Sequence, residues 1–364
     1  MIHYTRISSL VEELNRQKLT DLIISNPTTI FYLTGYENLH PGERFYVLHI
    51  SAHGNLTLHL NRLFPEPIAL PDNTAVIYHY DGEPALKPLA ESMATNAAIG
   101  IDKDWPSRFL LALMALKPDA TFANGSPISD GLRGIKSAEE IETMLEASHR
   151  NDQVMAKIIE KIPSGLPEST LVGELATLYR QHDCDGFSFD PIIAYGANGA
   201  DPHHITNDDT PKIGDSVIID IGSFYDGYAS DMTRTVFYGE PSDEARTVYQ
   251  TVLKANLNAI AQVKPGVTFA SIDKAARDVI EAAGYGQYFT HRTGHSIGIE
   301  VHEPGDVGPF NQDTVKVGNV FSIEPGIYLP GKLGVRIEDL VVVTEDGCRV
   351  LNEAPKDLQI IQPK

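Results

Sequence analysis

Two aspartates flank a short polar turn within an otherwise apolar stretch. Asp220 ends the run 217–220, Asp226 and Gly227 form a hairpin signal, and Asp231 follows it. An antiparallel hairpin would bring the two aspartate carboxylates side by side, where they repel each other unless a cation lies between them. An unpaired carboxylate is costly to bury. Taken alone, the pair is also compatible with two carboxylates in solvent.

Three histidines lie close together further along the chain. His291, His295 and His302 fall within 12 positions, whereas the whole chain has 13 histidines. Gly294 and Gly298 lie on either side of His295 and allow the backbone to approach a neighbouring group closely. A single histidine is more often structural, but this clustering favours a functional site.

Two glutamates occur in apolar segments nearer the C-terminus. Glu324 ends a strand-like run at 319–323 and is followed by Pro325 and Gly326, which stop a strand. Glu338 lies inside a second strand-like pattern, at 336–344. Each glutamate alone could be a paired structural carboxylate. A functional role for either one therefore depends on the aspartates and histidines described above.

Together these residues offer four carboxylates and one imidazole as metal ligands. Such hard oxygen ligands with one nitrogen suit Mn²⁺, Co²⁺ or Zn²⁺. Two divalent ions balance about four negative charges, and two ions about 3.5–4 Å apart share a bridging hydroxide and polarise a carbonyl. We therefore predict a two-metal hydrolytic site, with manganese as the preferred ion. The predicted ligands are Asp220, Asp231, His295, Glu324 and Glu338.

Length and composition restrict the class of protein. The 364 residues are 42% hydrophobic and suit two globular domains. A net charge of −20 disfavours nucleic acid and anionic membranes as partners. No run of about 18 apolar residues is present, and residues 1–6 show no signal peptide pattern. The two cysteines, Cys184 and Cys348, form no Cys-x-x-Cys pair. We expect a cytoplasmic protein.

Elements of two kinds must position these residues. Strand-like segments at 21–25, 45–50, 55–60, 75–80 and 99–102 alternate with helical patterns, which predicts an α/β domain over residues 1–130. The first of these strands ends at the turn signal Asn26-Pro27. Loop residues follow at 125–136, and Ser137 with Glu140 forms a capping box that begins a long amphipathic helix.

Residues 131–364 form the second predicted domain, of the α+β class. Its strand-like segments lie at 217–220, 235–238, 319–323 and 336–344. Helical patterns cover 168–182, 242–263 and 268–283. All five predicted ligands lie in this domain.

The ligand set resembles the pita-bread metallopeptidases, which include methionine aminopeptidase, aminopeptidase P and prolidase. The order Asp, Asp, His, Glu, Glu and the surrounding motifs match, and the segments 25–27 and 32–36 look like the start of a creatinase-type N-terminal domain. The resemblance covers nearly the whole chain and is most specific over residues 140–350. It implies a creatinase-like domain at 1–130, a pita-bread catalytic domain at 131–364, and a homodimer.

The resemblance also implies a role for each ligand. Asp220 would bind one ion, Asp231 and Glu338 would bridge both ions, and His295 with Glu324 would complete the other. Glu324 would also move a proton from the bridging water to the leaving nitrogen.

Further residues match functional positions of the family outside the ligand set. His302 matches a catalytic histidine that contacts the scissile amide or the tetrahedral intermediate. A second histidine precedes the first ligand; His203 matches its spacing and His204 is the alternative. His291 resembles an active-site histidine. Arg336 matches an arginine that binds a substrate carboxylate or orients a ligand.

The resemblance favours peptidase activity on proline-containing substrates. The extra N-terminal domain argues against methionine aminopeptidase, and the intact ligands argue against creatinase. Prolidase, which cleaves Xaa-Pro dipeptides, is preferred because the chain is compact, and aminopeptidase P, which acts on longer peptides, is the alternative. A hydrolase of related small amides or esters and a non-catalytic binding module of the same fold are more remote.

One residue of the N-terminal domain is a candidate for selecting substrate length. Arg44 ends a polar, turn-rich segment at 38–44. In the related enzymes this domain, often from the other subunit, covers the active site, so Arg44 could hold the carboxylate of a dipeptide. A solvated loop arginine is the competing interpretation.

Overall fold

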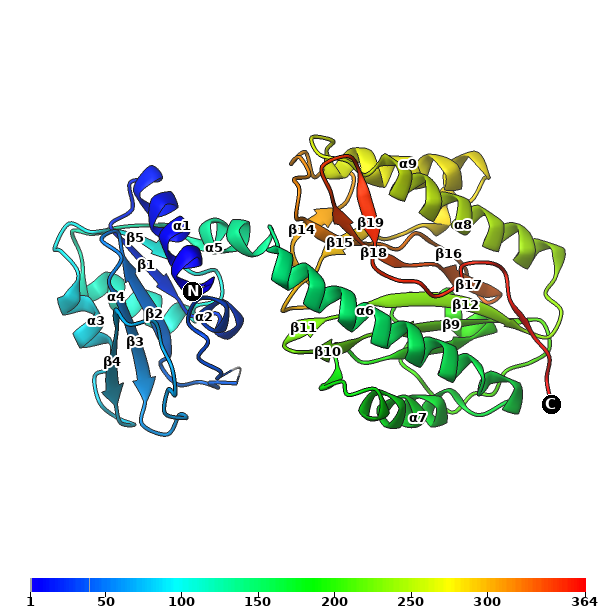
Figure 1. Ribbon diagram of the computed structural model, residues 1–364, viewed down its shortest axis with the longest axis horizontal. Helices are drawn as coiled ribbons and strands as arrows, with labels where there is room; N and C mark the ends of the chain where they lie inside the picture. Colours follow the sequence, from blue (N-terminus) through cyan, green and yellow to red (C-terminus); the bar gives the residue numbers. More distant parts are fainter. Residues whose placement is uncertain (1, 39) are drawn as a thin grey trace. The chain divides into compact units, whose positions relative to one another are not determined.

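The computed structural model describes residues 2–38 and 40–364, and the chain divides into two compact units, Met1–Arg133 and Gly134–Lys364. Figure 1 shows both, coloured along the sequence. Leu39, within the segment 38–44, lies outside the described residues. No helix in the described part of the chain combines the length and the apolar character needed to cross a membrane.

The first unit is built on a six-stranded mixed sheet with the order β4-β3-β2-β1-β5-β6. β1 pairs antiparallel with β2 and parallel with β5. The strands are β1 (Asp21–Ile24), β2 (Val47–Ser51), β3 (Leu56–Asn61), β4 (Thr74–His79), β5 (Ala98–Ile101) and β6 (Thr121–Asn124). All five strand-like segments expected in this unit are present, with bounds shifted by one or two residues.

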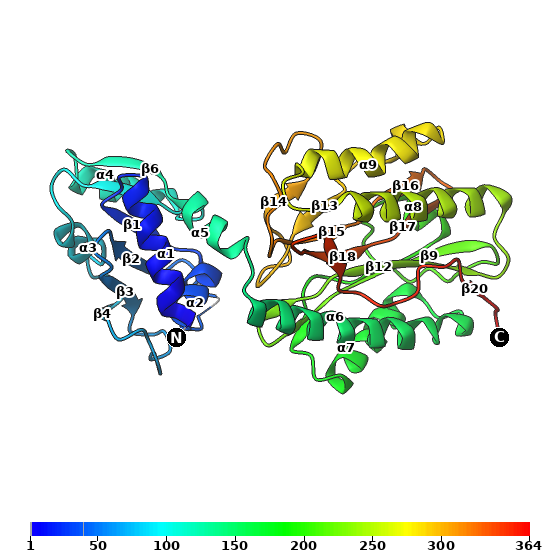
Figure 2. The same ribbon diagram turned by 45° about the horizontal axis from the view of Figure 1, so that its top comes forward.

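Helices pack on both faces of this sheet, which confirms the α/β class (Figures 1 and 2). On one face, Ile23 of β1 joins a buried apolar cluster with Leu89 and Leu113 from two of the helices. The helices are α1 (Ile2–Arg16), α2 (Pro27–Thr34), α3 (Leu86–Ser92), α4 (Ser107–Leu116) and α5 (Ser126–Arg133).

The second unit contains two main layers, which are antiparallel except that β20 pairs parallel with β12. One is a four-stranded sheet with the order β20-β12-β9-β8, and the other is a five-stranded sheet with the order β14-β13-β15-β18-β19. Their strands are β8 (Ile192–Tyr195), β9 (Asp215–Ile221), β12 (Met232–Tyr238), β13 (Gly294–Ser296), β14 (Glu303–Val307), β15 (Val320–Ile323), β18 (Asp339–Val343), β19 (Cys348–Val350) and β20 (Ile360–Ile361).

Two smaller sheets complete the second unit. β11, β10 and β7 form a three-stranded sheet, and β16 pairs with β17. Their strands are β7 (Gly186–Phe187), β10 (Ser223–Tyr225), β11 (Tyr228–Ala229), β16 (Gly326–Leu329) and β17 (Leu333–Arg336). β17 packs so closely on the turn η2 (Gly196–Ala200) that a Cβ on Gly334 would lie 1.7 Å from the carbonyl oxygen of Gly199, so only glycine fits there.

Two pairs of helices cover the layers from opposite sides (Figures 1 and 2). Val154 and Leu175 from one pair share a core with Ile219 of β9, and Val252 from the other pair shares a core with Phe321 of β15. The helices are α6 (Ala138–Ile159), α7 (Glu168–Gln181), α8 (Asp243–Gln262) and α9 (Phe269–Ala282), with single turns η1 (Ile162–Ser164) and η3 (Gly286–Tyr288). The expected helices at 168–182, 242–263 and 268–283 are confirmed as α7, α8 and α9.

Two local predictions are confirmed in atomic detail. The side chain of Ser137 accepts the backbone N–H of Glu140, and the Glu140 carboxylate accepts the N–H of Ser137, so the capping box begins α6. Asp226 and Gly227 both have positive φ, 48° and 77°, and form the two-residue turn between β10 and β11.

The expected single strand at 336–344 is wrong. Arg336 ends β17 and pairs with Gly326, whereas Asp339 begins β18 and pairs with Ile323. The chain therefore passes from one sheet to another across residues 337–338. Glu338 lies at this crossing and not inside a strand. The prediction failed because the residues on both sides of the crossing are apolar and resemble one continuous strand.

Candidate metal centre

The predicted ligands lie within or directly beside strands of the two main layers. Asp220 lies near the end of β9, opposite Thr233 of β12, and Asp231 directly precedes β12. His295 lies in β13, Glu324 directly follows β15, and Glu338 directly precedes β18. These strands have buried apolar neighbours, so the polar side chains at their ends are held on a rigid scaffold.

Three of these side chains form a compact ligand cluster. One ligand atom each of Asp231, His295 and Glu338 lie within 4.8 Å of one another, and all three residues are buried. The His295 Nε2 atom lies 3.5 Å from an oxygen of Asp231 and 3.5 Å from an oxygen of Glu324. The carboxylate of Asp220 belongs to the same electrostatic group, because its charge raises the pKa of Asp231.

The electrostatics of the cluster favour a bound cation. Burial, followed by repulsion from neighbouring carboxylates, raises the pKa values of Asp231 and Glu338 well above the usual range. Burial is also the main cause that raises the pKa of Glu324 to about 7, although Arg336 opposes the shift. A divalent cation would remove this repulsion and let the carboxylates stay ionised.

Two oxygen atoms of the cluster are available to bind a metal ion. Asp220 Oδ1 and Glu338 Oε1 are buried and accept no hydrogen bond from any described residue. Buried polar atoms normally have a partner, so these two oxygens fit the role of metal ligands. Burial, with a contribution from His302, lowers the pKa of His295 to about 3, which keeps its imidazole neutral, as a ligand requires.

Neighbouring hydrogen bonds orient the ligands. Thr233 donates its hydroxyl to Glu338 Oε2 over 2.7 Å and accepts from Arg336 Nε over 3.1 Å. Ser322 donates to Glu324 Oε1 over 3.2 Å and accepts the backbone N–H of His295 over 3.0 Å. Such partners fix the direction of ligand lone pairs. Neither residue was predicted, although Thr233 shares the strand face of Asp231 by the two-residue period.

Arg336 connects one ligand to a buried tyrosine and a histidine. Its Nη2 atom donates to Asp220 Oδ2 over 2.6 Å, and its Nη1 atom donates to the Tyr328 hydroxyl over 2.9 Å. That hydroxyl lies 2.8 Å from His291 Nε2, while His291 Nδ1 lies 2.6 Å from the carbonyl oxygen of Arg292. Burial, together with the charge of Arg336, lowers the pKa of His291 to about 4. Tyr328 was not predicted from the sequence.

The cluster opens into a cavity of about 570 Å³. All the site residues predicted in the second unit line it, including His302 and His203. His204 does not line the cavity, because its Nε2 atom pairs with the buried carboxylate of Glu168 at 2.7 Å. Further lining residues that sequence reasoning missed are Phe189, Asp190, Ile192, Pro202, Arg292 and Val301.

Arg44 belongs to the first unit and is not among the residues that line this cavity. Its guanidinium donates to both carboxylate oxygens of Asp81, at 3.2 and 3.1 Å. Arg44 and Asp81 line a cavity of about 320 Å³ together with Arg108. The suggested contact of Arg44 with a substrate carboxylate stays a prediction.

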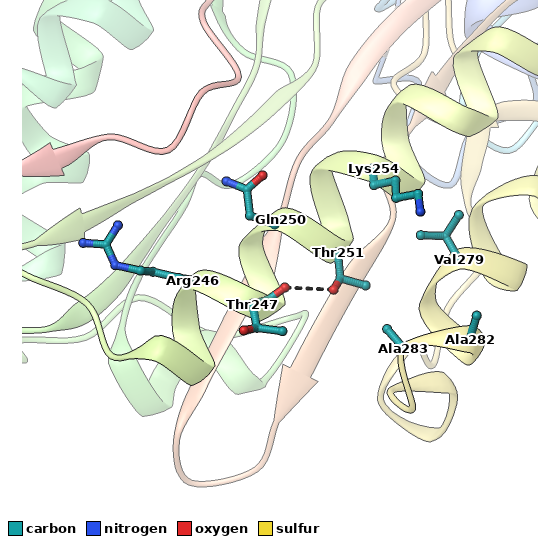
Figure 3. Close-up of a pocket in the computed structure, with 8 residues that line it drawn as sticks. All are labelled: Arg246, Thr247, Gln250, Thr251, Lys254, Val279, Ala282 and Ala283. Atoms are coloured by element: carbon teal, nitrogen blue, oxygen red, sulfur yellow. Dashed lines mark hydrogen bonds between the residues drawn. The ribbon is translucent and has the colours of Figure 1, made fainter.

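Another cavity, of about 540 Å³, lies between α8 and α9 (Figure 3). It is lined by Arg246, Lys254, polar side chains of α8 and small apolar side chains of α9, and the hydroxyl of Thr251 donates to the carbonyl oxygen of Thr247. Among the described residues, no carboxylate or imidazole lines this cavity. The candidate metal ligands line the cavity beside Asp231 and His295 and not this one.

Removing the hydrogen bond between Thr233 and Glu338 should weaken metal binding. We expect Thr233→Val to reduce the affinity of the metal-stripped protein for Mn²⁺ about 10–100-fold, because Glu338 loses the partner that orients it. Isothermal titration calorimetry measures the affinity. Thr235→Val is the matched control, since the Thr235 hydroxyl donates to the backbone carbonyl of Arg336 and not to a ligand. Equal losses in both variants would contradict the orienting role.

Comparisons with known proteins identify the family of the chain. The model of metallopeptidase family M24 matches residues 142–345, and that of the creatinase/prolidase N-terminal domain matches residues 6–135. An uncharacterized peptidase of Staphylococcus aureus is 34% identical over 359 residues, covering 97% of this chain and all of the relative.

Solved structures of related enzymes are similar to this chain over nearly its whole length. A prolidase from Thermococcus sibiricus shares 34% identity with a TM-score of 0.91, covering 99% of this chain and 100% of its own. An X-Pro aminopeptidase from Thermotoga maritima shares 28% identity with a TM-score of 0.81, covering 96% of this chain and 100% of its own. The expected combination of a creatinase-like α/β domain and a pita-bread α+β domain is confirmed. The chain therefore belongs to metallopeptidase family M24 and carries a creatinase/prolidase N-terminal domain.

Proposed function

We propose that this metallopeptidase hydrolyses the Xaa-Pro bond of dipeptides, the prolidase reaction. The observation that carries the proposal is the cluster of Asp231, His295 and Glu338, whose ligand atoms lie within 4.8 Å beside a cavity of about 570 Å³. Similarity to the Thermococcus prolidase, which exceeds that to the Thermotoga X-Pro aminopeptidase, supports the choice of substrate.

Two divalent ions would act as the cofactor, with Mn²⁺ preferred and Co²⁺ or Zn²⁺ as alternatives. When bound, such ions supply a hydroxide nucleophile at neutral pH and polarise the scissile carbonyl. The free oxygens of Asp220 and Glu338 and the neutral imidazole of His295 support this role. Asp231 and Glu324 complete the proposed ligand set.

Glu324 is the proposed proton carrier of the reaction. Its carboxylate lines the cavity, and the Ser322 hydroxyl holds one of its oxygens. In this position it would accept a proton from the attacking water and donate it to the leaving proline nitrogen. Proline nitrogen needs such a donor, because the amine leaves poorly without protonation.

The histidines that line the cavity would bind the reacting amide. His302 and His203 are proposed to donate hydrogen bonds to the oxygen on which negative charge develops. His291 is proposed to contact the substrate. Arg336 already donates to Thr233, Tyr328 and Asp220, so its geometry favours orienting Asp220 over binding a substrate carboxylate.

Aminopeptidase P activity on longer peptides is the second candidate. The ligand set is the same for both activities, and the resemblance that supports prolidase extends to an X-Pro aminopeptidase. A related small amide or ester is a more remote substrate. We also propose a cytoplasmic homodimer: the resemblance supports the dimer, and the two unpaired cysteines, Cys184 and Cys348, suit a reducing compartment.

Hydrolysis of Leu-Pro compared with Leu-Pro-Pro tests the function directly. The protein is stripped with a chelator and reloaded with Mn²⁺, Co²⁺ or Zn²⁺ before each assay. We expect metal-restored cleavage of Leu-Pro, fastest with Mn²⁺, and little cleavage of Leu-Pro-Pro. Preference for the tripeptide would establish aminopeptidase P activity instead, and no cleavage of either peptide would contradict both candidates.

Changes at the two proposed catalytic residues should reduce turnover and leave the fold intact. Glu324→Gln removes the proton carrier and should lower kcat about 10²–10⁴-fold. His302→Ala removes a donor to the developing charge and should lower kcat about 10²–10³-fold. Steady-state kinetics on Leu-Pro measures both effects, with circular dichroism as the folding control. Full activity in either variant would refute the role given to that residue.

Arg44→Ala tests whether the N-terminal domain selects dipeptides. If Arg44 binds the substrate carboxylate, its loss should raise KM for Leu-Pro at least about tenfold and leave kcat nearly unchanged, because uniform binding is lost. Arg62→Ala is the matched control, since Arg62 is an exposed arginine of the same domain that pairs with Glu66. An unchanged KM in Arg44→Ala would end the hypothesis.

A further inference from the structure

A buried ion pair lies just outside the proposed active site. Lys136 Nζ lies 2.9 Å from Glu303 Oε2, and the two side chains are only 1% and 3% exposed. Lys136 belongs to the segment between α5 and α6, while Glu303 begins β14 directly after His302. Burying two charges is costly and brings little net stability, so the pair calls for an explanation other than stability.

The lysine is fixed through its backbone as well as its side chain. The N–H of Lys136 donates to the carbonyl oxygen of Gly318 over 2.8 Å. A Cβ on Gly318, whose φ is +87°, would lie 2.9 Å from the carbonyl oxygen of Lys136. Lys136 is therefore a rigid anchor that fixes the position of the Glu303 carboxylate.

Glu303 in turn supports the loop at 297–302. Its Oε1 atom accepts the backbone N–H of Ile299 over 3.2 Å. A Cβ on Gly298 would lie 2.8 Å from both oxygens of the carboxylate, so the loop backbone passes directly over it. The carbonyl oxygen of Gly298 also accepts the N–H of Ala229, two residues before the ligand Asp231.

This loop joins two residues of the active site. His295 precedes it and His302 ends it, and their rings meet edge to face with centroids 4.2 Å apart. Both rings line the cavity, whereas Lys136 and Glu303 do not. The ion pair therefore acts on the site through the loop that it supports.

We propose that Lys136 and Glu303 are positioning residues, and that their ion pair holds His302 in the place from which it acts on the substrate. The kinetic part of this proposal rests on the proposed function, because it takes His302 as a catalytic residue. The geometric part does not, since the position of the His302 ring can be observed without substrate.

Lys136→Met tests the geometry first. Methionine fills a similar volume but cannot pair with the Glu303 carboxylate. A crystal structure of the variant should show the loop at 297–302 shifted or poorly ordered, with the His302 ring no longer in contact with His295. An unchanged loop with His302 in its original place would overturn the proposal, whatever substrate the enzyme cleaves.

The kcat of Lys136→Met should fall as it does when the catalytic contribution of His302 is lost. We expect kcat for Leu-Pro to fall about tenfold or more and KM to change less than about threefold, because the substrate binds but the transition state is less stabilised. In the His302→Ala background the same change should alter the residual kcat less than about twofold, since the two effects are coupled. Full additivity of the two losses would show a merely structural role.

Two further variants distinguish a loss of catalysis from a loss of folding. Lys136→Met/Glu303→Gln leaves no unpaired buried charge, so its Tm should return towards that of the wild type while kcat stays low. A wild-type kcat in this double variant would contradict the proposal. Leu175→Ala, in the buried core on α7, is the stability control and should lower Tm without lowering kcat. Absence of any Xaa-Pro cleavage by the wild type would refute the proposed function but would leave the structural test of Lys136 intact.

Discussion

Mutual repulsion among buried carboxylates is the constraint on which the catalytic unit depends. Asp231 and Glu338 are buried, Asp220 and Glu324 line the same cavity, and the negative charges of these residues are unfavourable so close together. Arg336 compensates part of this charge through its contact with Asp220, and a bound cation would compensate the rest. Such a cluster can persist only if rigid elements prevent the side chains from moving apart, so the sheets around it serve chemistry as much as stability.

The surrounding scaffold meets this need with hydrogen bonds from strand residues. Thr233 and Ser322 lie in strands of different sheets, and each holds a ligand carboxylate. Both are buried hydroxyls whose other partners belong to the site. Strands are fixed along their length by backbone pairing. The fold therefore sets the direction of the lone pairs of the carboxylates of Glu338 and Glu324, whether or not a metal ion is bound.

The sequence predicts most of the site because its signals are local. Asp231 adjoins a hairpin turn with a clear Asp-Gly signal, and the capping box at Ser137 marks a helix start unambiguously. Arg336 was predicted, but the hydroxyl partners Thr233 and Ser322 were missed. Tyr328 was missed as well, since it meets His291 and Arg336 through tertiary packing. The helix α2 was missed because Asn26 and Pro27 resemble a turn, yet Asn26 caps the helix and Pro27 occupies its first turn.

The passage of the chain from β17 to β18 also limits how the protein can evolve. Arg336 and Asp339 are held in register by different sheets, and only two residues, Ile337 and Glu338, span the crossing. Gaining or losing one residue there would rotate the Glu338 side chain away from its cluster or break one of the two registers. Across a lineage, the length of this segment should therefore be preserved as strictly as the identity of the glutamate itself.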